Sequence, residues 1–127
     1  MKIRCDQNSI RIRVRKSELV QLRAEQWLAA SLHFPDGQVF TWELILDEQA
    51  GELQAHYAEG RIRIHLPPPA AREWMESDAV GLERFLPTGG GATLHLLIEK
   101  DFPCKDRAGE DKSDFFTELA EVTPVTC

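Results

Sequence analysis

Cysteine is scarce in this 127-residue chain, and its three copies lie far apart, at positions 5, 104 and 127. Their number is odd and no CxxC spacing occurs, so the sequence does not indicate a disulfide framework. Proteins of oxidising compartments that are this small are often disulfide-dense. We therefore expect a reducing, cytoplasmic location.

Long apolar runs are also absent, since no stretch approaches the roughly 18 residues of a membrane-spanning helix. The segment 1–6 has no apolar core of the kind found in secretory signal peptides, and we expect none. Basic residues are in the minority, with 15 lysines and arginines against 21 acidic residues and a formal net charge of -6. This balance argues against general nucleic-acid binding and against binding to anionic membranes.

The composition is otherwise that of a folded domain, with 43% hydrophobic and 28% charged residues. A chain of this length buries a core without disulfides or metal ions. We predict one α+β domain over residues 1–116 and a C-terminal tail over residues 117–127.

Hydrophobic periodicity predicts the elements of this domain. Residues 10–15 alternate between apolar and basic, as in a strand with one buried face. Ser17 offers a side-chain cap for a helix over 17–25, and Pro67 opens a second helix that ends near 77. Further strands are expected at 30–34, 38–47, 52–57, 61–66, 80–86 and 93–102. The last of these places Phe102 on its core side.

The resulting fold class is α+β, with mainly antiparallel sheets of about seven to eight strands and two helices. One hairpin has a specific register: a two-residue loop at 59–60 pairs Tyr57 with Ile62 and His56 with Arg63, like with like. A three-residue loop is the alternative, because Glu59 is unfavourable at positive φ. The similarity of 9–13 to 60–64, each before a helix, also suggests a pseudo-repeat of a strand–helix unit.

Alternating arginines form the first candidate site. They are Arg11, Arg13 and Arg15 on one strand, and Arg61, Arg63 and His65 on another. If the two strands share a sheet face, Arg11, Arg13, Arg61 and Arg63 form a guanidinium cluster that binds phosphate or carboxylate. The alternative is a solvated face on which these residues pair with Glu43, Asp47 and Glu52.

Thiol and carboxylate groups form a second candidate cluster after the last strand: Asp101, Cys104, Arg107, Glu110, Asp111 and Asp114. The cluster lacks the ligand pattern of a structural zinc site or an EF-hand, so we predict no metal and no cofactor. The four histidines, at 33, 56, 65 and 95, have no HExxH spacing. The glycines at 89–91 precede a strand, which indicates a hairpin linker rather than a phosphate-binding loop. Arg107 is expected to pair with one of the neighbouring carboxylates.

The same C-terminal residues carry a resemblance to a known family. They are Ile98 to Phe102, Cys104, Arg107, Glu110, Asp111, Asp114 and Phe116, together with Met1 to Arg4, Asn8 to Arg11, Lys16 to Glu18, Glu73-Trp74 and Ser77 to Gly81. In these residues the chain resembles a small bacterial family of unknown function. The resemblance implies no activity.

The leading functional hypothesis is a non-catalytic domain that binds a protein partner or associates with itself. Three tryptophans, Trp27, Trp42 and Trp74, support it, because aromatic residues are enriched at interfaces as well as in cores. One alternative is a metal- or thiol-dependent enzyme that uses the C-terminal cluster. A second alternative is the binding of a phosphate ligand by the arginine-lined strand face.

Overall fold

The computed structural model describes residues 1–102, in which two strands, a helix and two strands follow one another twice. The first half contains β1 (Lys2–Asp6), β2 (Ser9–Val14), α1 (Lys16–Glu25), β3 (Trp27–His33) and β4 (Val39–Leu46). The second half contains β5 (Gln54–Ala58), β6 (Arg61–Leu66), α2 (Pro68–Glu76), β7 (Gly81–Pro87) and β8 (Thr93–Lys100). The predicted α+β class, with two helices and about eight strands, is confirmed.

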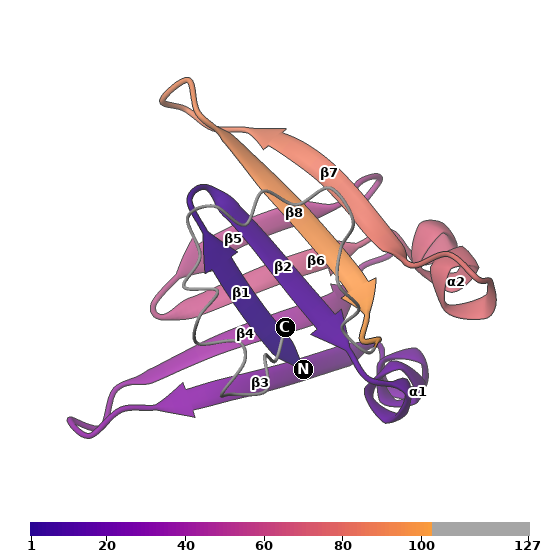
Figure 1. Cartoon of the computed structure of the whole chain (residues 1–127), viewed down its shortest axis with the longest axis horizontal. Helices are drawn as coiled ribbons and strands as arrows, with labels where there is room; N and C mark the ends of the chain where they lie inside the picture. The colour runs from indigo at the N-terminus through magenta and orange to yellow at the C-terminus, as the bar shows by residue number, and fades with distance from the viewer. Residues whose placement is uncertain (103–127) are drawn as a thin grey trace, which may run out of the picture.

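The strands form two sheets, and each sheet takes one hairpin from each half of the chain. Sheet A has the order β1-β2-β8-β7, and sheet B has the order β3-β4-β6-β5. Strands are antiparallel within each hairpin but parallel where the hairpins meet, at β2–β8 and β4–β6. The prediction of mainly antiparallel sheets is therefore right, but it did not include these two central pairings. In Figure 1 sheet A lies in front of sheet B, and their strands cross obliquely.

The two halves occupy equivalent positions, as the backbone hydrogen bonds show. The N–H of Asp101 donates to the carbonyl of Val14 at 2.9 Å, and the N–H of Asp47 donates to that of Leu66 at 3.0 Å. Ile12 lies opposite Ile98 in sheet A as Ile64 lies opposite Leu44 in sheet B. The outer faces of the two sheets can therefore be compared position by position.

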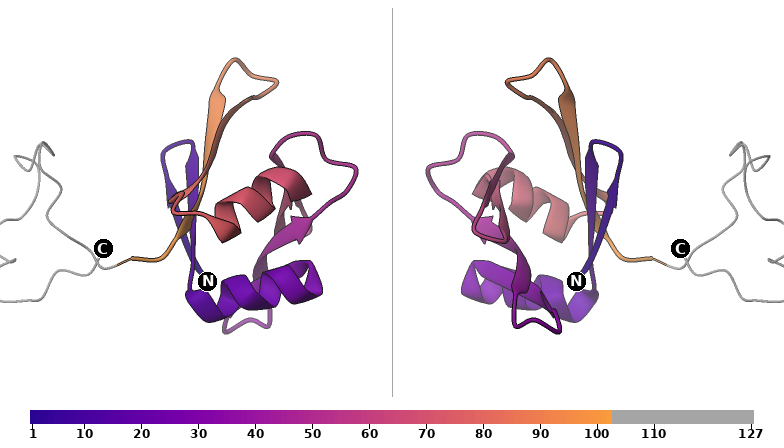
Figure 2. Two further views of the ribbon diagram at one scale, coloured as in Figure 1. Left: turned by 90° about the vertical axis from the view of Figure 1, so that its right-hand side faces the viewer. Right: turned by 90° about the vertical axis from the view of Figure 1, so that its left-hand side faces the viewer.

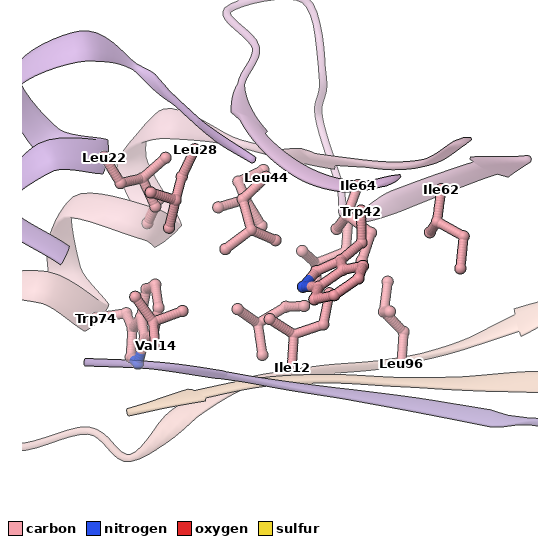
Figure 3. Packing of buried hydrophobic residues seen from close by; sticks show 14 residues of the cluster. Ile12, Val14, Leu22, Leu28, Trp42, Leu44, Ile62, Ile64, Trp74 and Leu96 are labelled. Carbon is pink, nitrogen blue, oxygen red and sulfur yellow. The ribbon is translucent and has the colours of Figure 1, made fainter. Parts of the chain in front are cut away.

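A hydrophobic core fills the space between the sheets (Figure 3). Both sheets supply fully buried side chains to it, among them Ile12 and Leu96 from sheet A and Leu44 and Ile64 from sheet B. The helices lie at the same end of the two sheets and cover the opening between them (Figure 2). They contribute Leu22 and Trp74, and each such side chain stabilises the fold by about 1.5–3 kcal/mol through burial.

The first helix begins one residue earlier than predicted, and Ser17 is not its cap. Arg15 holds the cap position, and its N–H donates to Glu18 Oε1 at 3.0 Å. Glu18 also accepts a hydrogen bond from the amino group of Met1. Partial burial raises the pKa of Glu18, but the hydrogen bonds from Met1 and Arg15 outweigh burial and lower the pKa below its usual value.

The hairpin register predicted for β5 and β6 is confirmed, with Tyr57 opposite Ile62 and His56 opposite Arg63. Its loop has two residues, and both Glu59 and Gly60 adopt positive φ, at 52° and 74°. Two positive φ angles produce the tight turn whose twist matches that of the strands, so glutamate accepts the unfavourable conformation.

Phe102 does not lie on the core side of the last strand. The strand ends at Lys100, so its period of two does not extend to Phe102. The Phe102 ring is 41% exposed and stacks on Arg13, whose Cζ lies 4.6 Å from the ring centroid. Arg13 belongs to the side of sheet A that faces away from the core.

Candidate functional site

The sheets separate the arginines that the sequence grouped together. Arg11 and Arg13 lie on β2 in sheet A, whereas Arg61 and Arg63 lie on β6 in sheet B. All four point away from the core, because Ile and Val residues at alternate positions point into it. The guanidinium cluster predicted for a shared sheet face is therefore two separate pairs.

Outer face B is the side of sheet B that faces away from the core. Its residues include Ala29, Ser31, Thr41, Glu43, Ile45, His56, Arg61, Arg63 and His65. Arg61 Nη1 donates to Glu43 Oε1 at 2.7 Å, and Arg63 Nε donates to Glu43 Oε2 at 3.1 Å. Glu43 is only 4% exposed, while both arginine side chains are about half exposed. This carboxylate neutralises both arginines from within the sheet.

Asp47 provides a second acidic group at the same face. His65 Nδ1 lies 3.0 Å from Asp47 Oδ2, and the rings of His65 and His56 meet edge to face with centroids 5.4 Å apart. Outer face B thus matches the solvated, charge-paired alternative for Arg61, Arg63 and His65.

Outer face A consists of the corresponding residues of sheet A: Lys2, Arg4, Asp6, Ser9, Arg11, Arg13, Glu83, Phe85, His95, Leu97 and Glu99. Here basic residues stand directly opposite one another across β1 and β2, Lys2 with Arg13 and Arg4 with Arg11. Like charges in directly opposite positions destabilise a sheet. The arrangement therefore favours an anion over these two rows.

On β8, the position equivalent to Glu43 holds Leu97. Leu97 stands opposite Arg11 where Glu43 stands opposite Arg63. The nearest acid on the same strand is Glu99, whose Oε1 lies 3.8 Å from Arg11 Nε and 4.0 Å from Arg13 Nε. Both distances exceed the range of a hydrogen bond. Among residues 1–102, no carboxylate pairs with Arg4.

Arg13 is the most deeply buried cation of the face, with 5% of the residue exposed. Its Nε and Nη2 atoms are buried and have no hydrogen-bond partner. Burying such donors without an acceptor costs about 1–3 kcal/mol, and more for charged groups. Only the contact with the Phe102 ring and the distant Glu99 carboxylate offset this cost in the described part of the chain.

Asp101 is the one member of the predicted C-terminal cluster within the described residues. Its Oδ2 lies 3.1 Å from Lys2 Nζ, beside the basic rows. The other members, Cys104, Arg107, Glu110, Asp111 and Asp114, lie outside residues 1–102, as do the expected pairing of Arg107 and the domain boundary at 116.

Within residues 1–102, no three histidine, cysteine or carboxylate side chains converge as metal ligands. On face A, His95 stacks on Phe85 with ring centroids 4.3 Å apart, and its Nε2 lies 3.4 Å from Glu83. The glycines at 89–91 belong to the loop between β7 and β8, where the sequence placed a hairpin linker.

Lys2, Arg4 and Leu97 lie on face A but were not predicted as site residues. The first two lie on β1, which was not predicted as a strand because only Ile3 and Cys5 interrupt its charged residues. Its alternation of charged and apolar residues, from Lys2 to Asp6, is nevertheless the same signal that predicted β2. The role of Leu97 emerges only from comparison with Glu43 across the two sheets.

The described residues form an α+β domain of two mixed four-stranded sheets, with arginines on the outer face of each sheet. The chain belongs to a family described as a family of unknown function (DUF7009), whose model matches residues 1–119. Neither the curated proteins nor the solved structures contain a match to it. Neither α1 nor α2 is long and apolar enough to cross a membrane, and residues 1–102 contain no other α-helix.

Proposed function

We propose that this protein is a non-catalytic binding domain that recognises an acidic polypeptide segment on outer face A. The observation that carries the proposal is the pair of like-charged rows, Lys2 with Arg13 and Arg4 with Arg11, next to Leu97. An anion placed over these rows removes the repulsion and offers acceptors to the buried donors of Arg13.

The shape of the face favours an extended chain over a compact phosphate. Its two basic rows repeat every second residue, roughly 6.6 Å apart along the strands. Alternate side chains of an extended peptide repeat at the same distance, so that successive acidic residues meet successive rows. Phe102 adds an aromatic surface beside Arg13.

The acidic groups around the rows limit the kind of anion that binds. Asp6, Glu83, Glu99 and Asp101 border the four cations, and the whole chain carries a net charge of -6. A long polyanion such as a nucleic acid duplex meets repulsion at these borders. A short acidic segment contacts the rows and avoids most of the border.

Arg61 and Arg63 are not part of the proposed site. Glu43 already binds both, and an external anion competes with a carboxylate held inside the sheet. Of the four arginines singled out in the sequence, we assign only Arg11 and Arg13 to the site, together with Lys2 and Arg4.

A cytoplasmic location is part of the same proposal. Cys5 is an exposed free thiol on β1, which is compatible with a reducing compartment.

The test is a titration of the ¹⁵N-labelled full-length chain with a synthetic peptide of about ten residues that alternates glutamate and serine, followed by NMR. We expect shifts at the amides of β1 and β2, and weaker binding at about 200 mM than at about 50 mM salt. In the Arg4→Gln/Arg11→Gln variant we expect affinity to fall at least about tenfold.

The matched control is Arg23→Gln/Arg72→Gln, which removes the same charge from two exposed arginines on the helices. It should bind the peptide as the wild type does. Equal loss in both variants would show that net charge alone is responsible and would contradict the proposal. Binding of inorganic polyphosphate without binding of the peptide would also contradict it.

A further inference from the structure

We propose that β3 is a dimerisation edge, to which a second copy of this chain adds its own β3 in antiparallel orientation. The contact is centred on Ser31 and joins the B sheets of the two copies into one continuous sheet. It uses a surface separate from outer face A, so it does not rest on the proposed function.

β3 lies at the edge of sheet B, and backbone hydrogen bonds show which of its polar groups point outward. The N–H of Phe34 donates to the carbonyl of Gln38 at 2.9 Å, and that of Leu46 donates to Gln26 at 3.0 Å. Hydrogen-bonded pairs alternate along an antiparallel ladder, so the even-numbered residues of β3 bind β4. The N–H and carbonyl groups that point away from the sheet belong to Trp27, Ala29, Ser31 and His33.

The side chains of this edge lack the charges that usually prevent strand addition. From Gln26 to Pro35 the sequence contains no lysine, arginine, aspartate or glutamate. The edge strand β7 carries Glu83, Arg84 and Pro87, and the edge strand β1 is rich in charged residues. β5 is uncharged but has only five residues, against seven in β3. Short, charged or proline-containing edges resist pairing, so β3 is the edge best suited to accept another strand.

The position of α1 indicates the register of the pair. α1 packs against the start of β3, whereas the other end of β3 leads into a hairpin that extends away from both helices (Figure 1). A second strand therefore has most room over the later residues of β3. Centring the antiparallel pair on Ser31 places Ala29 opposite His33 of the second copy. The three resulting residue pairs all use outward-pointing groups and supply about six backbone hydrogen bonds.

This register also covers exposed apolar side chains near the hairpin. Leu32 and Phe34 are 50% and 49% exposed. In the dimer they lie opposite Ala30 and Leu28 of the second copy, and the two-fold axis repeats each contact. A second copy is therefore an occupant that matches apolar side chains with apolar ones and leaves no charge buried at the edge.

Net charge gives the dimer a distinctive dependence on salt. Each copy has a formal net charge of -6, so two copies repel one another at long range. Salt screens this repulsion but leaves the uncharged contact at β3 intact. Dimerisation therefore strengthens with salt, whereas the proposed binding of an acidic peptide to outer face A weakens.

The experiment measures the mass of the full-length chain by sedimentation equilibrium over a range of micromolar concentrations. A reducing agent is present, so that the exposed thiol of Cys5 forms no crosslink. The test variant Ser31→Lys places two lysines opposite one another at the two-fold axis. The matched control Gln54→Lys adds the same charge to an exposed position on β5, the other edge of sheet B.

We expect the wild type and Gln54→Lys to dimerise alike, and Ser31→Lys to dimerise at least about tenfold more weakly, because directly opposed like charges repel. An equimolar mixture of Ser31→Lys and Ser31→Glu should form dimers again, because the axis places the lysine opposite the glutamate. A further measurement needs no variant. In the wild type, deuterium exchange at the amides of Ala29, Ser31 and His33 should slow as the protein concentration rises.

A wild type that stays monomeric over this range would overturn the proposal, even if a different protein binds the edge. Equal dimerisation of Ser31→Lys and Gln54→Lys would overturn it too, as would a mixture that stays monomeric although both Ser31 variants are folded. Peptide binding to outer face A does not depend on any of these results.

Discussion

At the scale of single residues, the two outer faces differ at one pair of equivalent positions on their central strands. Glu43 on β4 and Leu97 on β8 occupy equivalent places opposite Arg63 and Arg11. Glu43 binds both Arg61 and Arg63 on face B, whereas on face A the Glu99 carboxylate lies 3.8 Å from Arg11. The same arginine-rich alternation thus produces two faces with different chemistry.

Glu43 and its partners should contribute unequally to stability. Replacing both Arg61 and Arg63 by glutamine leaves Glu43 buried without a cation, and loss of the partners of a buried charge costs about 3–5 kcal/mol. In Glu43→Gln the two half-exposed guanidinium groups turn to water, so the cost is only about 1–2 kcal/mol. Urea unfolding of the three proteins measures both effects, and the reverse order would contradict this account of face B.

At the scale of elements, the sequence predicted what period-two alternation determines. It placed Tyr57 opposite Ile62 because a slip of one residue would exchange the buried and exposed faces of the hairpin. It did not predict that β2 pairs with β8, because alternation states which side chains are buried but not which strand is the neighbour. Arg11 and Arg61 were therefore considered together, although they lie in different sheets.

Two further features were not predicted from the sequence: strand β1, because it is rich in charged residues, and the exposed position of Phe102, because β8 ends before it. β1 contains Lys2, Arg4 and Asp6, and its apolar positions are too few to stand out. At the other end, Phe102 continues the spacing of Leu96 and Ile98 but lies beyond the end of β8. For these two reasons the sequence predicted neither the basic rows across β1 and β2 nor the contact of Phe102 with Arg13.

Edge strand β7 provides a test of the packing within sheet A. A Cβ added at Gly81 would lie 2.3 Å from the carbonyl oxygen of Ile98, whereas one added at Gly89 has nothing within 4 Å. We expect Gly81→Ala to lower the free energy of unfolding by about 2–3 kcal/mol, because the backbone of β8 must move. Gly89→Ala should be neutral or slightly stabilising. Equal effects in thermal and urea unfolding would show that β7 does not approach β8 this closely.

At the scale of the whole molecule, the exchange of hairpins ties the two halves into one unit. Each sheet is completed only when β2 meets β8 or β4 meets β6, and both sheets share one core. The pseudo-two-fold arrangement then presents two equivalent outer faces on opposite sides of the molecule (Figure 2). We propose recognition on outer face A, where basic residues stand directly opposite one another across β1 and β2.

The most direct measurement transfers the neutralising carboxylate from one face to the other. In full-length Leu97→Glu, a carboxylate opposite Arg11 should occupy the place that Glu43 has opposite Arg63, with Leu97→Gln as the matched control. The alternating glutamate and serine peptide serves as the probe, and the shifts of β1 and β2 amides report its binding.

We predict that Leu97→Glu binds the peptide at least about tenfold more weakly than Leu97→Gln, because the new carboxylate competes with the peptide for the basic rows. Glu83 stands directly opposite position 97 on β7, so this new like-charge pair opposes the roughly 0.2–1 kcal/mol gained from each opposite-charge pair, and the comparison of peptide affinity carries the test. Equal peptide affinity in the two variants, with both folded, would contradict the claim that outer face A is the binding site.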